Sequence, residues 1–312
     1  MIKEIKRIFN NKLFFGIIIF CLVFFFMFIC YYNANGVKIA GLDIDKYQDK
    51  AELKNIIESV NEKINLDNDN EVYKEQLVIY NYLYDNEIAF EDTKNIRASY
   101  IYQYGKDRFD YTTFGFLFNE FMFFFLSIVI VNFVIKKDFK NGFYKMLYTM
   151  NGRKEIVFNK ISTIFLLVNI GYMIFSVFLL ISSVVYKLNF NKILIINSGS
   201  CALLNTELYM ILMFISSYIA ILQMLTMFIS IALIVNSVES FYFISIILLL
   251  LYVTFLQLSI YPVNVFLSEL IGYFTLNVSN SIFLVLFIIK TLSIISLFYF
   301  SVNYFLRKDL IN

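Results

Sequence analysis

Six apolar runs dominate the sequence and restrict what the chain can fold into. A helix that crosses a membrane needs ~20 mainly apolar residues, and the runs of about this length are residues 13–32, 114–135, 161–186, 208–235, 240–261 and 282–306. A single soluble domain does not fit this composition, because 60% of the chain is hydrophobic and only 16% is charged. We therefore expect an all-α, multi-pass integral membrane protein with six transmembrane helices.

One polar segment, residues 33–113, interrupts the apolar runs. It holds 26 of the 50 charged residues and has a net charge of −6. Apolar residues recur at helical spacing on both sides of the polar run 67–70, which predicts two amphipathic helices joined by a turn. We expect a small helical domain that caps the membrane surface or contacts a substrate or partner. The rest of the chain divides into an interfacial segment 1–12, a first transmembrane helix 13–32 and a membrane domain 114–312.

Lysine and arginine are distributed unevenly between the two sides of the expected helices. Thirteen of them fall in the segment 1–12, the loop 136–160 and the C-terminal tail, whereas the short loops of the other side hold only Lys187 and Lys192. Basic residues that flank spanning helices favour the cytoplasmic side. We therefore expect a cell-membrane protein with both termini cytoplasmic and residues 33–113 extracytoplasmic. The amphipathic basic segment 1–12 suits the inner membrane interface.

The chain lacks the residues on which most enzyme and nucleotide sites are built. It has no histidine, no G-x-x-x-x-G-K-[ST] loop, and three cysteines whose positions suggest neither a disulfide framework nor a metal site. A net charge of +2 is too small to indicate nucleic-acid binding. We expect no catalytic residue, no bound metal and no cofactor, so the chain is not an enzyme by itself.

The basic loop, residues 136–160, contains the most informative pattern. Within this loop, Asp138 and Gly142 follow the second apolar run, Leu147 lies in an expected helix, and Arg153 and Lys160 lead into the third run. This pattern resembles the loop after the second span in permease subunits of the type-2 exporter family of ABC transporters. The six runs, the basic N-terminus and the large first outer loop also resemble that family in layout.

The resemblance implies a function and a set of partners. The chain would be the permease subunit of an ATP-driven exporter and would form the translocation path in the lipid bilayer, as a homodimer or with a second similar permease. ATP would be bound and hydrolysed by a separate cytoplasmic ABC ATPase subunit. The alternative is a non-transporting membrane immunity or sensor protein whose outer domain binds a peptide or another ligand.

Apolar residues in the basic loop offer a physical basis for coupling to such an ATPase. Phe143, Met146 and Leu147 have the spacing of one helix face, which suits a groove in a partner. The basic residues around them would steer the loop toward acidic partner residues. The alternative is a basic loop that only follows the positive-inside rule, with its apolar residues in the lipid interface.

Four polar side chains fall within the expected membrane helices. Glu120 and Lys290 are functional candidates because ionisable groups are costly in lipid, whereas Asn169 and Gln223 are expected to form interhelical hydrogen bonds. Glu120 and Lys290 lie at similar distances from the inner ends of their runs, which predicts an ion pair at equal depth. In the alternative, each group reaches the lipid headgroups independently.

Overall fold

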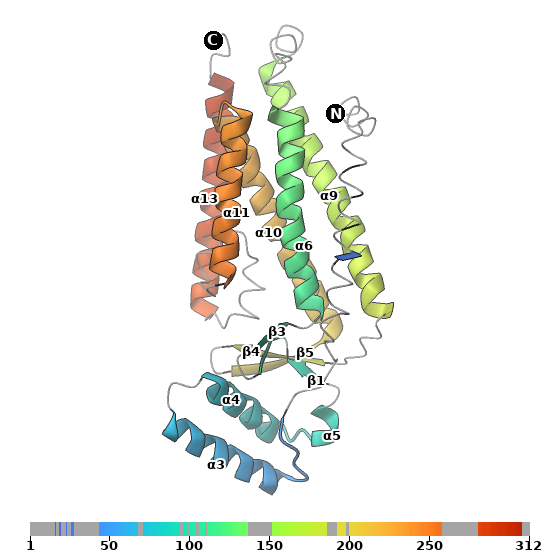
Figure 1. Ribbon diagram of the computed structural model, residues 1–312, viewed down its shortest axis with the longest axis vertical. Helices are drawn as coiled ribbons and strands as arrows, with labels where there is room; N and C mark the ends of the chain where they lie inside the picture. The colour runs from blue at the N-terminus through green and yellow to red at the C-terminus, as the bar shows by residue number, and fades with distance from the viewer. Residues whose placement is uncertain are drawn as a thin grey trace.

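A computed structural model gives the fold of the chain (Figure 1). It describes residues 44–67, 71–93, 96–98, 100–103, 106–109, 111–136, 152–185, 192–197, 200–257 and 280–307, with the helical residues Gly16, Ile19, Val23, Phe26 and Met27. This part of the chain is mostly helical. It comprises a bundle of long apolar helices, a polar domain at one end of the bundle, and short strands between the two.

The long helices of the bundle lie side by side in Figure 1. They are α6 (Tyr111–Val131) with the π-helix η1 (Asn132–Lys136), α9 (Arg153–Val185), α10 (Thr206–Ile234), α11 (Val238–Gln257) and α13 (Asn280–Arg307). The described helices that are long and apolar enough to cross a membrane are Asn119–Lys136, Lys154–Leu179, Thr206–Ile234 and Phe287–Arg307. This finding is compatible with an integral membrane protein. A total of six spans stays a prediction. Most of the run 13–32 lies outside the described residues, and of the run 240–261 only the shorter apolar stretch Val238–Leu248 is found.

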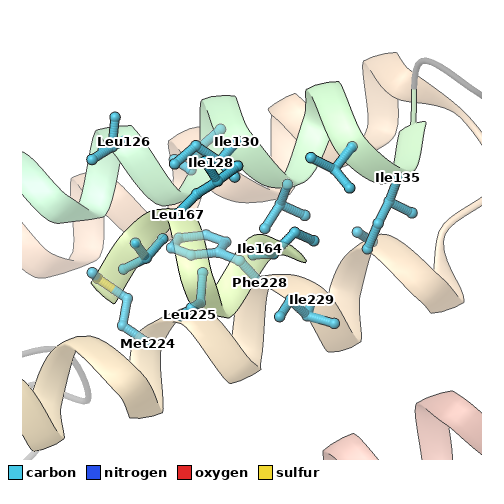
Figure 2. Close-up of a cluster of buried hydrophobic side chains, with 14 of the residues drawn as sticks. Leu126, Ile128, Ile130, Ile135, Ile164, Leu167, Met224, Leu225, Phe228 and Ile229 are labelled. Atoms are coloured by element: carbon cyan, nitrogen blue, oxygen red, sulfur yellow. The ribbon is translucent and has the colours of Figure 1, made fainter. Parts of the chain in front are cut away.

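Helix α10 is at the centre of this packing. It contacts both α6 and α13, and α6 also contacts α9. Figure 2 shows side chains of α6, α9 and α10 that meet in the core. The rings of Phe124 and Phe228 pack edge to face with their centroids 5.0 Å apart. Lipid tails are as apolar as these side chains, so van der Waals contact rather than exclusion from water would hold such helices together.

The helices of the bundle differ strongly in burial. In the span Asn119–Lys136, 78% of the residues are buried inside the protein. In the most apolar 18-residue stretch of Phe287–Arg307, only 11% are buried. Large apolar side chains such as Phe243 of α11 and Tyr299 of α13 are exposed. In a membrane, these outward faces would contact lipid or another protein.

The polar domain is built on a pair of amphipathic helices, α3 (Lys50–Leu66) and α4 (Glu71–Asp85), followed by the short α5 (Phe90–Thr93). The two helices bury a common core that includes Leu53, Val60, Tyr80 and Leu83. Leu53, Val60 and Tyr80 belong to the two stripes that the helical spacing predicted, and the structure adds Leu83 to this core. The helix pair is therefore observed as expected.

Backbone groups at the start of α3 and at the end of α4 form hydrogen bonds with nearby residues of the chain. Asp49 is the N-cap of α3, and its carboxylate accepts a hydrogen bond of 2.8 Å from the Glu52 backbone N–H. The Glu52 carboxylate in turn accepts a bond of 2.6 Å from the Gln48 backbone N–H. At the end of α4, Glu87 adopts a left-handed conformation with φ of 51°. The Ile88 N–H then reaches the Leu83 carbonyl at 3.0 Å, as in a Schellman motif.

Five short strands depart from the all-α expectation. Strand β4 (Lys192–Asn197) pairs antiparallel with β5 (Ser200–Asn205) and parallel with β1 (Ile96–Ala98), while β2 (Tyr100–Gln103) pairs with β3 (Lys106–Phe109). Both antiparallel pairs have only two intervening residues, one of them glycine, and β4 is rich in isoleucine. These are the sequence features of β-hairpins. The β1–β4 pair joins the polar segment to the connection between α9 and α10.

Candidate functional site

The basic loop connects two helices at one end of the bundle. It leaves η1 and returns at Arg153, the first residue of α9. Figure 1 places this end of the bundle opposite the helices α3 and α4. The other loop residues singled out by the sequence lie outside the described residues; these are Asp138, Gly142, Phe143, Met146 and Leu147. Their assignment to a coupling element stays a prediction.

Lys160 lies inside the bundle instead of on its surface. Its side chain is 2% exposed, and its Nζ donates a hydrogen bond of 2.9 Å to the backbone carbonyl of Val134 in η1. The sequence contains a signal for this position, because Lys160 falls between Val157 and Ile164 on the apolar stripe of α9. In the described conformation, Lys160 therefore connects α9 to η1 from within.

Lys136 makes a second contact of the same kind, which no local pattern in the sequence predicts. It is the last residue of η1, its side chain is 1% exposed, and its Nζ donates to the backbone carbonyl of Val235. Val235 is the C-cap of α10. The last carbonyls of a helix have no partner within the helix and carry a partial negative charge. A lysine ammonium group suits that position.

A third contact connects η1 to α11. The Asn132 side-chain amide donates a hydrogen bond of 2.6 Å to the Tyr242 hydroxyl. Together, these contacts join η1 to α9, to the end of α10 and to α11. The π-helix, whose wider turn often marks a functional position, is therefore tied to three neighbouring elements at the end of the bundle where the basic loop begins.

Glu120 lies in a polar cluster between α6, α9 and α10. Its side chain is 3% exposed, and its carboxyl group is near enough to the Tyr172 hydroxyl to interact with it electrostatically. The hydroxyls of Ser176 and Ser217 also lie close to that of Tyr172. The Tyr172 hydroxyl donates a bond of 2.8 Å to the Phe214 carbonyl. Glu120 is thus buried within the bundle and does not lie on its outer surface.

The two neutral polar residues form the interhelical hydrogen bonds that were expected of them. The Gln223 side-chain amide on α10 donates to the Thr291 hydroxyl on α13 at 2.9 Å. The Tyr218 hydroxyl on α10 donates to the Asn169 side-chain carbonyl on α9 at 2.7 Å. Both bonds involve α10, which confirms the prediction for Gln223 and Asn169 and adds to the central position of α10.

Lys290 lies on α13, next to Thr291 in the sequence, and is partly buried. Helix α13 packs against α10, whereas Glu120 is buried on α6, which packs against α9 and α10. The ion pair between Glu120 and Lys290, within one chain or between two copies, stays a prediction.

The polar domain contacts the sheet through Tyr82 of α4. Burial raises the pKa of Tyr82, nearby Cys201 raises it further, and a hydrogen bond with the Leu203 backbone acts in the opposite direction. Leu203 and Cys201 belong to β5, and β5 ends at Asn205, which is the N-cap of α10. The polar domain therefore contacts a strand, β5, that continues directly into α10, the central helix of the bundle.

No group of histidine, cysteine or acidic residues suited to a metal ion occurs among the described residues. The described arrangement offers polar contacts between helices and an apolar outer surface. Comparison with known proteins found no matching family model, no matching curated protein and no matching solved structure.

Proposed function

We propose that this chain is the permease subunit of an ATP-driven exporter and works with a separate ABC ATPase subunit. The observation that carries the proposal is the basic loop: its sequence resembles the corresponding loop of type-2 exporter permeases, and it joins two long apolar helices, α6–η1 and α9, at one end of the bundle. A motor protein in the cytoplasm needs a contact of this kind to move the membrane part.

In this proposal the bundle has six spans and the basic end faces the cytoplasm. The excess of lysine and arginine near that end supports this orientation. The polar helices α3 and α4 lie at the opposite end of the bundle in Figure 1, as an extracytoplasmic domain requires. The translocation path forms between two permeases, either two copies of this chain or this chain and a similar subunit.

The coupling residues have distinct roles in the proposal. Phe143, Met146 and Leu147 seat in a groove of the ATPase through apolar contact. Arg153, at the start of α9, supplies a positive charge toward acidic residues of the partner. Asp138 and Gly142 belong to the loop through its resemblance to the exporter family.

Co-purification tests the proposal directly. The tagged chain is expressed in its native host and purified in mild detergent, and bound proteins are identified by mass spectrometry. We expect a protein with a nucleotide-binding loop, and we expect ATP hydrolysis by the complex but not by the chain alone. Replacing Phe143, Met146 and Leu147 by serine should release that protein while the chain still inserts into the membrane. A wild-type complex without any nucleotide-binding subunit would contradict the proposal.

A sensor or immunity protein is the second candidate, and one observation favours it. The polar domain contacts β5 through Tyr82, and β5 runs directly into α10. A ligand that binds the polar domain would therefore act on the centre of the bundle without a transport cycle. A chain that binds an external peptide with its ATPase partner absent, and that protects cells in a transport-deficient background, would support this candidate.

A further inference from the structure

Two buried lysines, Lys136 and Lys160, are the first and last residues of the basic loop. Lys136 ends the helix that enters the loop, and Lys160 lies in the second turn of the helix that leaves it. Their side chains are 1% and 2% exposed, although both residues belong to a segment rich in charges. Lys154, on the same helix as Lys160, is exposed. The burial of the two lysines is thus specific to their positions.

Each lysine binds a backbone carbonyl of a different helix. Lys136 reaches from η1 to Val235 at the end of α10, and Lys160 reaches from α9 to Val134 in η1. A buried ammonium group requires acceptors that replace water, and a helix C-terminus offers both an acceptor carbonyl and a favourable dipole. The bonds therefore connect three helices in sequence, α9 to η1 and η1 to α10.

The geometry points to a lysine clamp, made of Lys136, Lys160 and the carbonyls of Val235 and Val134, that fixes both ends of the basic loop to the bundle. Lys136 and Lys160 are positioning residues of this clamp. The inference rests on the proposed function for its consequence: a force on the loop moves the ends of η1 and α10 together with α9. Since α10 continues from β5, the same movement reaches the sheet at the other end.

Hydrogen exchange in the purified full-length chain tests the clamp without any partner. We expect Lys136→Met to accelerate exchange at the end of α10, residues 231–235, by about tenfold, the change that loss of one hydrogen bond to a charged group produces. Lys160→Met should accelerate exchange in η1 by a similar factor. Lys154→Met is the matched control, because it removes the same charge from an exposed position, and it should change neither segment.

Conservative variants separate positioning from a general need for a folded bundle. Lys136→Arg keeps the charge and a donor, and it should restore most of the protection at 231–235 that Lys136→Met loses. A methionine variant that elutes as an aggregate in size-exclusion chromatography is replaced by the corresponding glutamine variant, which also lacks the ammonium group and should show the same faster exchange. If both methionine variants exchange like Lys154→Met, the clamp is overturned.

A second readout concerns coupling. In the co-purified complex, Lys136→Met and Lys160→Met should retain the ATPase subunit but lower the rate of ATP hydrolysis by the complex several-fold, with recovery in Lys136→Arg. Unchanged hydrolysis in both methionine variants would overturn the transmission role. If no ATPase binds even the wild-type chain, the proposed function fails, and the exchange measurement alone supports or overturns the clamp.

Discussion

The polar domain and the bundle satisfy their helix ends in different ways. In the polar domain, Asp49 caps α3 from three residues away and Glu87 closes α4 with a local turn. In the bundle, the end of α10 is bound by Lys136, 99 residues earlier in the chain. In the polar domain, water can donate a hydrogen bond to any backbone carbonyl that a local cap leaves exposed. In a membrane interior, no water is present to replace a missing hydrogen-bond partner. The carbonyl at this end of α10 therefore depends on a tertiary contact.

The largest expected effect tests packing in the bundle. Phe228 of α10 is fully buried against Phe124, so Phe228→Ala should lower the free energy of unfolding by ~3–5 kcal/mol. Phe300 of α13 is 59% exposed, and Phe300→Ala should cost less than ~0.5 kcal/mol. Unfolding in mixed micelles with increasing SDS measures both. Equal losses for the two variants would show that α10 and α13 are buried alike in the native protein.

The next effect tests the core of the polar domain. Leu83 is fully buried and Leu66 is 88% exposed. Leu83→Ala should therefore lower local stability by ~2–4 kcal/mol, with little change for Leu66→Ala. Hydrogen exchange of α3 and α4 in the full chain is the measurement. Protection of α10 should stay the same in both variants; its loss would mean that the two regions unfold as one unit.

The same contrast explains which features were readable from the sequence. The helix pair α3–α4 and four long apolar helices follow from local spacing of apolar residues. The burial of Lys160 was also readable, because it lies on the apolar stripe of α9, but its charge suggested a surface role. No local sequence pattern predicts the hydrogen bond from Lys136 to Val235, because the two residues are 99 positions apart in the chain.

The strands divide in the same manner. Within each of the pairs β2–β3 and β4–β5, only two residues separate the two strands. The hairpin signal in the sequence is therefore local, although the long apolar runs around it are more prominent. The parallel pair β1–β4 joins residues 96–98 to residues 192–194. No spacing in the sequence specifies that contact, so the sequence predicts residues 33–113 as a separate helical domain and gives no sign that β1 is the third strand of the sheet.

A smaller effect concerns the N-cap of α3. Asp49→Ala removes the acceptor of the Glu52 N–H and should lower the stability of the polar domain by ~1 kcal/mol. Asp49→Asn keeps an acceptor oxygen and should retain most of that stability. Exchange rates in the first turn of α3 distinguish the two. A loss of the same size in both variants would assign the effect to the charge of Asp49 and not to its hydrogen bond.

The corresponding contact inside the bundle is expected to contribute less than its buried position suggests. Gln223→Leu removes the bond to Thr291 between α10 and α13, and such bonds in membranes contribute only ~0.6 kcal/mol on average. A double-mutant cycle with Thr291→Val in SDS unfolding isolates this term. A coupling energy several times larger would show that this single contact holds α13 to the bundle.

The smallest effect concerns the left-handed residue Glu87. A non-glycine residue with φ of 51° is strained, and Glu87→Gly should relieve that strain. Glycine loses more backbone entropy on folding, so the stability of the polar domain should rise by less than ~0.5 kcal/mol. Glu87→Val should lower it, since a β-branched side chain fits this conformation worst. Exchange rates in α4 measure both changes.

The ion pair of Glu87 works against the gain from glycine. Its carboxylate lies 3.0 Å from the Lys50 Nζ, but both side chains are largely exposed, so water and salt weaken the attraction. Glu87→Gln removes the charge and keeps the backbone strain, which isolates the pair.

The hydrogen bond to Glu87 raises the pKa of Lys50 above its ordinary 10.5. The contribution of the pair is therefore complete below that value and is lost as the pH rises through the raised pKa. The difference between wild type and Glu87→Gln should thus be constant near neutral pH and vanish in strong base. The gain from Glu87→Gly should persist in base and become slightly larger, because the pair that opposes it no longer contributes. A gain that vanished in base would contradict backbone strain as its cause.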